Sequence, residues 1–242
     1  MRAFRADLHV HTCLSPCAEV LQSPRNIAAA AKRRALDLVG VCDHNSAENA
    51  GAVAEAAGRV GVRAFPGLEI TSREEVHVLA IFDEVESALG LQARVYAALA
   101  GENDPDVFGL QVVANAEDEV VGFNRRFLAG ATSLSLSDVV GAIHEFGGLA
   151  VAAHADREGF GLVGQLGFIP DGLPLDALEI SPRLSLEEGR RTFGPGWPLL
   201  SSSDAHAPDE IGRASTSFWL EEGTVREIGL ALQGVGERRL LG

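Results

Sequence analysis

The sequence predicts an α/β fold, in which parallel strands surrounded by helices form a closed or nearly closed barrel. Short apolar stretches typical of strands recur along the chain, and several of them alternate with helical patterns. This alternation is typical of parallel strands joined by right-handed crossovers. With 242 residues, 46% of them hydrophobic, the chain can also form one sizeable core. We therefore expect a single domain over residues 1–242.

Seven stretches have the length and apolar composition of buried strands. They cover residues 4–10, 38–42, 62–70, 76–82, 149–153, 177–180 and 199–202.

Two helices are expected after the first two strands. Ser23 can cap the N-terminus of the first helix, Pro24 suits its first turn, and the run NIAAAAKRRAL contains strong helix formers. A second helix is expected over about residues 46–59.

Residues 84–135 interrupt the alternation of strands and helices. This segment is acidic, contains GENDPD and AEDE, and includes the helical pattern ESALGLQARVYAALA. We interpret it as a small, largely helical insertion that forms a subdomain or a lid.

The composition restricts the classes of partner. The net charge of −14, from 20 Lys and Arg against 34 Asp and Glu, argues against a broad basic surface for nucleic-acid backbones, so we expect a small partner and no long nucleic acid. The three cysteines, Cys13, Cys17 and Cys42, are too few for a secreted disulfide framework. The first residues lack an apolar signal core, and no apolar run reaches 18 residues. We therefore expect a cytoplasmic protein that does not enter a membrane.

Residues that commonly bind metals follow the predicted strands. His9 and His11 lie on the same face of the first strand, so two imidazoles can reach one metal, although such a pair alone would be weak evidence. In α/β barrels the loops after the strands build the active site. His144 instead lies in a helical pattern, and we expect a structural role for it. The candidates that follow later strands are His44, Glu69, His154, Asp204 and His206, with His77 in or near the end of a strand.

Six short motifs occur in one order between residues 7 and 206: DLHVHT, CDHN, GLEIT, EVHVLAI, AAHADR and SSSDAH. Together they resemble the PHP (polymerase and histidinol phosphatase) family of metal-dependent phosphoesterases. The resemblance implies a distorted seven-stranded (β/α) barrel with up to three divalent metal ions. It implies as metal ligands His9, His11, His44, Glu69, His77, His154, Asp204 and His206.

The chemistry of this ligand set agrees with the resemblance. Neutral imidazoles and carboxylates suit Zn, Mn or Fe, and a carboxylate can bridge two ions. Glu69 is the candidate for the bridge. Asp204 could bind the first metal beside His9 and His11, while His206 reaches toward another ion.

One motif departs from the family pattern. The first motif usually continues to Ser-Asp, but this chain has Pro16 after Ser15, and proline cannot bind a metal through its side chain. Glu19 could replace the ligand from farther along the loop, Cys17 could supply a thiolate, or one metal could be held less completely. We favour Glu19 over Cys17, because free cysteines are commonly small buried fillers.

Metal ions about 3.5–4 Å apart hydrolyse phosphate esters by lowering the pKa of a bound water and neutralising phosphoryl charge. We therefore expect a metal-bound water as nucleophile, beside Asp204 and His206. Arg157 is the predicted phosphate contact, and Arg183 is a second candidate. The glycine-rich stretch 159–165 is expected to shape the pocket wall, with Phe160 packed in the core rather than stacked on a base.

The leading hypothesis is hydrolysis of a small phosphomonoester or a nucleotide. The enzymatic alternative is a phosphodiesterase or an exonuclease on short oligonucleotides. A metal-stabilised binding module without catalysis is a third interpretation, because one family ligand is missing. A metal-dependent amidohydrolase is also chemically possible, although Arg157 favours a phosphate substrate.

Overall fold

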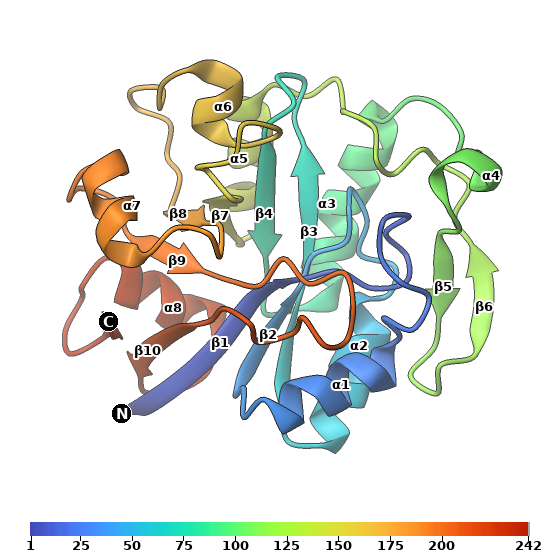
Figure 1. Cartoon of the computed structure of the whole chain (residues 1–242), viewed down its shortest axis with the longest axis horizontal. Helices are drawn as coiled ribbons and strands as arrows, with labels where there is room; N and C mark the ends of the chain where they lie inside the picture. Colours follow the sequence, from blue (N-terminus) through green and yellow to red (C-terminus); the bar gives the residue numbers. More distant parts are fainter. Residues whose placement is uncertain (242) are drawn as a thin grey trace.

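The computed structural model describes residues 1–241, and its centre is a nine-stranded mixed sheet that curls into most of a barrel (Figure 1). In spatial order the strands are β11 (Arg239–Leu241), β10 (Thr216–Leu220), β1 (Arg2–Val10), β2 (Leu38–Val41), β3 (Arg63–Thr71), β4 (His77–Ile81), β7 (Leu149–Ala152), β8 (Ala177–Ile180) and β9 (Leu199–Ser201).

All seven predicted strands are present, but the expected number of strands and their parallel pairing are corrected. The sheet also contains β10 and β11, which continue it in antiparallel pairing beyond β1. β4 pairs antiparallel with both β3 and β7. The connection from Thr71 to His77 is too short for the crossover that parallel strands need, so β4 must return along β3.

The chain that follows β9, the last strand of the sheet, returns to β1, the third strand from the opposite end. After β9 the chain forms a single parallel bridge between Ala205 and Val10. The backbone N–H of His11 donates to the Ala205 carbonyl at 3.0 Å, and the Ala205 N–H donates to the His9 carbonyl at 3.3 Å. This bridge holds the last part of the predicted site against the end of β1.

Residues 1–241 contain eight helices, and the sheet separates two hydrophobic clusters. The larger cluster contains Ile27, Val53, Leu91 and Val139, which lie on four different helices. The smaller cluster, on the other face of the sheet, includes Ile228. No helix in this range is both long and apolar enough to cross a membrane. The helices are α1 (Pro24–Arg33), α2 (Ala50–Arg59), α3 (Val85–Ala98), α4 (Pro105–Phe108), α5 (Leu136–Glu145), α6 (Leu162–Leu166), α7 (Leu186–Phe193) and α8 (Val225–Leu232).

The first two helices differ from the sequence prediction at their N-termini. Ser23 occupies the N-cap position of α1, but its side chain makes no capping hydrogen bond. α2 begins at Ala50, four residues later than expected, and the Ser46 hydroxyl instead bonds with that of Tyr96 at 2.7 Å.

The segment 84–135 is only partly helical. α3 packs Ala88, Leu91 and Val95 into the main core, and the short α4 follows it. The segment then forms an antiparallel hairpin of β5 (Val112–Ala114) and β6 (Val120–Phe123), outside the barrel (Figure 1). Its role as a subdomain or a lid stays a prediction.

Candidate metal centre

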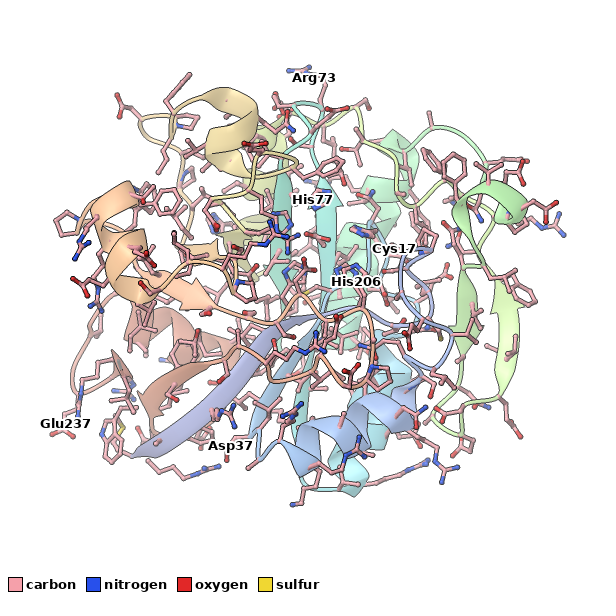
Figure 2. All side chains as sticks on the ribbon, in the orientation of Figure 1. Cys17, Asp37, Arg73, His77, His206 and Glu237 are labelled. Carbon is pink, nitrogen blue, oxygen red and sulfur yellow. The ribbon has the colours of Figure 1, made fainter. Side chains whose placement is uncertain are left out.

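The predicted metal ligands converge on one rim of the barrel, although their positions span most of the chain. Backbone pairing brings them together: a bridge between His44 and Glu69 continues the β2–β3 pairing, and the bridge at Ala205 places the next segment beside β1. His77 is the first residue of β4, because this antiparallel strand starts where β3 ends. Figure 2 shows His77, Cys17 and His206 grouped near the centre of the molecule.

One group of side chains consists of His9, His11 and Asp204. The Nε2 atoms of the two imidazoles are 3.1 Å apart, and Asp204 Oδ1 lies 3.3 Å from that of His9 and 3.2 Å from that of His11. The Nδ1 atoms contact Glu179 Oε1 at 3.0 Å and Ser15 Oγ at 2.9 Å. If Nδ1 carries the proton in each ring, both Nε2 lone pairs face the same space as a carboxylate oxygen.

Glu69 is almost completely buried and contacts imidazoles through both of its oxygens. Oε1 is 2.8 Å from His77 Nδ1 and 3.1 Å from His154 Nε2. Oε2 is 2.9 Å from His44 Nδ1 and 3.4 Å from His11 Nε2. A carboxylate with histidines at both oxygens is in the position required of a bridging ligand.

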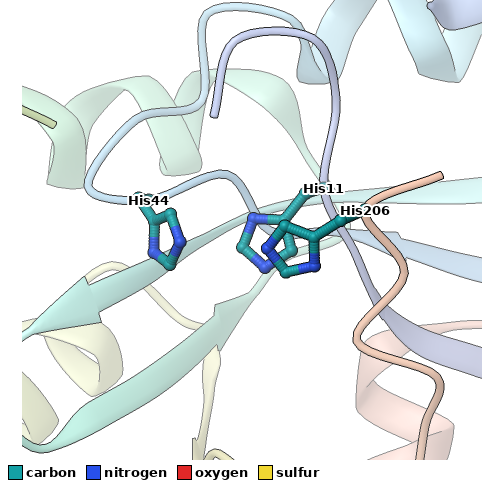
Figure 3. Close-up of side chains that lie close together, drawn as sticks. All are labelled: His11, His44 and His206. Atoms are coloured by element: carbon teal, nitrogen blue, oxygen red, sulfur yellow. The ribbon is translucent and has the colours of Figure 1, made fainter. Parts of the chain in front are cut away.

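A further group consists of His11, His44 and His206 (Figure 3). The His11 and His206 rings are stacked with their centroids 4.1 Å apart, and the His44 centroid is 4.6 Å from that of His11. His11 therefore belongs to two groups. The three groups, of which the remaining one is His44, Glu69 and His77, share residues and form a continuous cluster.

The cluster leaves polar atoms without partners, which is the clearest test of whether a cation would fit. Within residues 1–241, the buried atoms His154 Nδ1 and Glu179 Oε2 have no hydrogen-bond partner, and His44 Nδ1 and Glu69 Oε2, although only 2.9 Å apart, do not meet in hydrogen-bond geometry. Unpaired buried polar atoms are costly and rare. Divalent ions would satisfy several of them, and the imidazole and carboxylate donors suit Zn, Mn or Fe. The residues present therefore fit a metal cluster.

The carboxylates of the cluster are held in their ionised form. Burial raises the pKa of Glu69, but the imidazoles of His77 and His9 outweigh burial and keep the pKa well below its usual range. Asp204 behaves similarly, because His9 and His11 lower its pKa against the effect of burial. Ionised carboxylates are the form that binds metals.

The residues that follow Pro16 lie differently from expectation. Cys17 lines the cavity at the cluster, beside His44 and His206. The interaction of the thiol with these two imidazoles outweighs the effect of burial and lowers the pKa of Cys17 to about 6. Neither Cys17 nor Glu19 belongs to the three ligand groups in residues 1–241, and both are exposed, but Glu19 does not line this cavity. The structure therefore brings Cys17, rather than Glu19, to the cluster.

The two predicted phosphate contacts are in different positions. Arg157 lines the cavity at the cluster, which has a volume of about 270 Å³, and its Nη2 lies 2.7 Å from Asp204 Oδ2. Its side chain is 39% exposed. Arg183 does not line this cavity, but it joins Arg157 in an adjoining pocket of about 640 Å³. Only Arg157 is in direct contact with the cluster.

The glycine-rich loop forms part of the cavity wall. Phe160 is exposed there and stacks on His77, with ring centroids 4.5 Å apart, so the expectation that it packs in the core is wrong. A Cβ on Gly161 would lie 2.2 Å from the Arg157 carbonyl oxygen, so only glycine allows the loop to pack this closely.

Backbone conformations that are uncommon for non-glycine residues occur at the site. Asn45, His154 and Asp204 have φ angles of 51°, 30° and 51°. Such conformations persist only where surrounding contacts enforce them, and they cluster at functional sites. Asn45 also donates from Nδ2 to the carbonyls of Leu128 and Gly130, which hold Ala129 in the cavity wall.

Sequence reasoning missed Glu179. Its Oε1 accepts hydrogen bonds from the His154 backbone N–H at 3.1 Å and contacts His9 Nδ1. An acidic residue inside the apolar strand β8 was the available signal. His144, in contrast, lies on α5 and contacts Asp176 through Nε2 at 2.9 Å, so the structural role expected for it agrees with its position.

Comparison with known proteins finds one distant similarity in sequence and several in structure. No family model matches the chain. A Bacillus subtilis protein of uncharacterized function, YqxK, is 24% identical over 260 residues, covering 100% of this chain and 65% of YqxK. The lesion-specific endonuclease PfuEndoQ from Pyrococcus furiosus aligns with a TM-score of 0.76 and 22% identity, over 99% of this chain and 58% of that chain. The chain thus spans less than two thirds of both proteins.

Two shorter structures resemble the chain over most of their own length. A protein from Bifidobacterium adolescentis, provisionally assigned as a metal-dependent phosphoesterase, has a TM-score of 0.61 and 21% identity, with 86% of this chain and 91% of that chain covered. An amidohydrolase from Chromobacterium violaceum has a TM-score of 0.58 and 22% identity, with 98% and 97% covered. These similarities establish a shared fold with hydrolases.

The comparison corrects the expectation that no long nucleic acid is a partner. Endonuclease Q, which shares this fold, has been solved with a 27-mer duplex substrate that carries an abasic lesion at the active site. The net charge sums over the whole surface and does not describe the local field at a site. An acidic composition was therefore too weak a reason to exclude nucleic acid.

Proposed function

We propose that this chain is a metal-dependent phosphoesterase of the PHP type that hydrolyses phosphate esters at the rim cluster. The observation that carries the proposal is the buried carboxylate of Glu69 in contact with imidazoles at both oxygens. The resemblance of six ordered motifs to the PHP family and the shared fold with hydrolases support it.

In this proposal the three groups of side chains hold up to three divalent ions. His9, His11 and Asp204 would hold one ion, and Glu69 would link the groups. When bound, the ions would lower the pKa of a water molecule and neutralise charge on the phosphoryl oxygens. Asp204 and His206 would lie beside the reacting atoms. Cys17 would complete the group of His11, His44 and His206 in place of the family's missing ligand.

Arg157 supports a phosphate rather than an amide as substrate. It contributes the one permanently cationic side chain among the described residues that line the cavity at the cluster. A planar guanidinium can donate two parallel hydrogen bonds to a phosphate. In the absence of substrate its charge is balanced by Asp204, so the arginine is already positioned at the cluster.

A phosphodiester in a nucleic acid is the second candidate substrate, beside a small phosphomonoester or nucleotide. The adjoining pocket lined by Arg157 and Arg183 offers space for a group beyond the scissile phosphate. Phe160 exposes an aromatic ring at the cavity, and such rings stack on bases. The duplex complex of endonuclease Q also favours this candidate.

Activity of protein loaded with Mn, Zn or Fe tests the proposal. Phosphate release would be measured on nucleotides and sugar phosphates, and strand cleavage on labelled duplexes with and without an abasic site. Turnover of either class supports phosphoesterase activity and distinguishes the two candidates. Fully metallated protein that hydrolyses none of these substrates would contradict the proposal and favour a binding module.

The arginines provide a matched pair of variants in the same assay. Arg157→Ala should reduce turnover by about 10²-fold or more, because it removes charge stabilisation at the reacting phosphate, while metal content stays unchanged. Arg183→Ala should have a smaller effect. Metal loss in Arg157→Ala, or equal effects of the two substitutions, would contradict the role of Arg157.

A further inference from the structure

Asp43 is an almost completely buried carboxylate beside the metal centre, and it has no part in the proposed function. Its Oδ1 atom accepts hydrogen bonds from the Thr12 N–H and the Ser15 hydroxyl, both at 2.7 Å. Its Oδ2 atom accepts one from the Thr12 hydroxyl, also at 2.7 Å. A buried charge must be paired or hydrogen-bonded, and these three donors satisfy it. They all belong to the loop after β1, so Asp43 holds that loop from the end of β2.

The surroundings of Thr12 determine the direction of one of these bonds. The Thr12 hydroxyl oxygen accepts from the Leu14 N–H at 3.1 Å and from Asn49 Nδ2 at 2.9 Å, which occupies both of its lone pairs. The Asn49 amide is oriented by β5, because its Oδ1 accepts from the Ala114 N–H at 2.9 Å. The proton of the Thr12 hydroxyl is therefore directed to Asp43. The two donors of Thr12 favour the ionised form of this carboxylate.

The Ser15 hydroxyl connects Asp43 with His11. Its oxygen lies 2.7 Å from Asp43 Oδ1, 2.9 Å from His11 Nδ1 and 3.2 Å from the His44 backbone nitrogen. A hydroxyl has one proton and two lone pairs, so it can donate only one of these three bonds. The shortest contact joins the hydroxyl oxygen to a carboxylate oxygen, and the two would repel each other without a proton between them. The Ser15 proton therefore points to Asp43, and Ser15 accepts a hydrogen bond from His11.

We propose that Asp43 is a positioning residue, which acts through Ser15 to hold His11 in the tautomer with its proton on Nδ1. The inference rests on the proposed function, because it concerns how the chain prepares one ligand of the metal centre. A neutral imidazole has one N–H, so a proton on Nδ1 leaves the Nε2 lone pair free for a cation. The contacts of Nε2 agree with this tautomer. Asp204 Oδ1 at 3.2 Å and Glu69 Oε2 at 3.4 Å are both farther away than the partner of Nδ1 at 2.9 Å.

His9 and His11 are oriented in different ways. The Nδ1 atom of His9 contacts the Glu179 carboxylate directly at 3.0 Å, whereas the Ser15 hydroxyl stands between His11 and the Asp43 carboxylate. A partner that accepts from a metal-binding imidazole fixes the tautomer and the orientation of the ring, and its loss lowers metal affinity about 10- to 100-fold. We call the hydrogen bonds from Asp43 through Ser15 to His11 the relay. The relay gives a buried carboxylate this effect on a ring that it does not touch.

The position of the His11 proton tests the proposal directly. Nitrogen NMR of the metal-free full chain, labelled with isotope-enriched histidine and measured at neutral pH, distinguishes a protonated ring nitrogen from a bare one. Loss of one set of signals in His11→Gln assigns the ring. The wild-type chain should carry a proton on Nδ1 of His11 and none on Nε2. A proton on Nε2, alone or together with one on Nδ1, would overturn the proposal.

Two substitutions break the relay at different points. Ser15→Ala removes the acceptor of the His11 proton, and Asp43→Asn removes the charge that holds the Ser15 proton. Each should weaken Zn binding by about 10- to 100-fold in calorimetric titration, and each should give a fraction of His11 with its proton on Nε2. Ser202→Ala is the matched control, because the Ser202 hydroxyl is buried and has no hydrogen-bond partner within residues 1–241. It should leave both measurements unchanged, and circular dichroism would check that every variant folds.

The double variant tests whether Asp43 acts through Ser15. In a chain that already carries Ser15→Ala, Asp43→Asn should cause little further loss of Zn affinity, since residues of one hydrogen-bond network are not additive. Additive losses would overturn the proposal, as would single variants that lose stability but keep the wild-type tautomer and Zn affinity. If Asp43→Asn does not fold, Ser15→Ala and the wild-type spectrum still decide. Neither measurement depends on hydrolysis, so a failure of the proposed function can be distinguished from a failure of the relay.

Discussion

At the scale of single residues, the candidate site gathers more imidazole nitrogens and carboxylate oxygens than the surrounding hydrogen-bond donors can satisfy. The Nδ1 atom of His9 contacts Glu179, and that of His11 contacts Ser15. These contacts orient the two rings so that their Nε2 atoms lie 3.1 Å apart. The sequence could predict these histidines, since they follow strand ends. It could not predict that Cys17 rather than Glu19 would reach the cluster, because this depends on how the loop after β1 folds against His206.

Glu179 gives a test at this scale. Its charge fixes the orientation of His9, and the loss of such a partner typically weakens metal binding 10- to 100-fold. Glu179→Ala should therefore lower metal affinity by about that factor in calorimetric titration. Glu179→Gln keeps an acceptor oxygen and should have a smaller effect. Equal affinities for the wild type and both variants would contradict a positioning role.

At the scale of elements, strand direction decides which residues reach the rim. His77 reaches it only because β4 runs antiparallel and begins where β3 ends. The pattern of apolar residues predicted seven of the nine strands in the main sheet. It does not encode the direction in which strands pair, so the antiparallel pairing of β4 with β3 and β7 was missed. Four other strands were also missed: β5 and β11 have only three residues each and β6 has four, whereas β10 has five residues, TSFWL, whose alternating burial was an available signal.

The helix caps give a test at the element scale. Ser135 caps α5 in a reciprocal capping box with Asp138, whereas Ser23 makes no side-chain bond at the start of α1. Ser135→Ala should reduce the free energy of unfolding by about 1 kcal/mol. Ser23→Ala should change it less. Urea unfolding monitored by circular dichroism would compare them, and a larger loss for Ser23→Ala would contradict this account of the caps.

At the scale of the whole molecule, the cluster links segments from residue 9 to residue 206. The bridge at Ala205 and the hydrogen bond of Glu19 N–H to the His206 carbonyl at 2.8 Å hold the last loop against the first. A bound metal would therefore connect the end of β1 with the segment that follows β9. The sequence predicted this convergence from the barrel fold, but net charge, a property of the whole chain, wrongly excluded nucleic acid.

The number of metal ions per chain, measured by elemental analysis after loading and removal of excess metal, tests the central claim most directly. The wild-type protein should retain two or three ions, in accord with its three ligand groups. Glu69→Gln should lose at least one of them, because this isosteric change removes the charge of the linking carboxylate. A wild-type chain that retains no stoichiometric metal, or a Glu69→Gln variant that retains all of it, would contradict the metal centre.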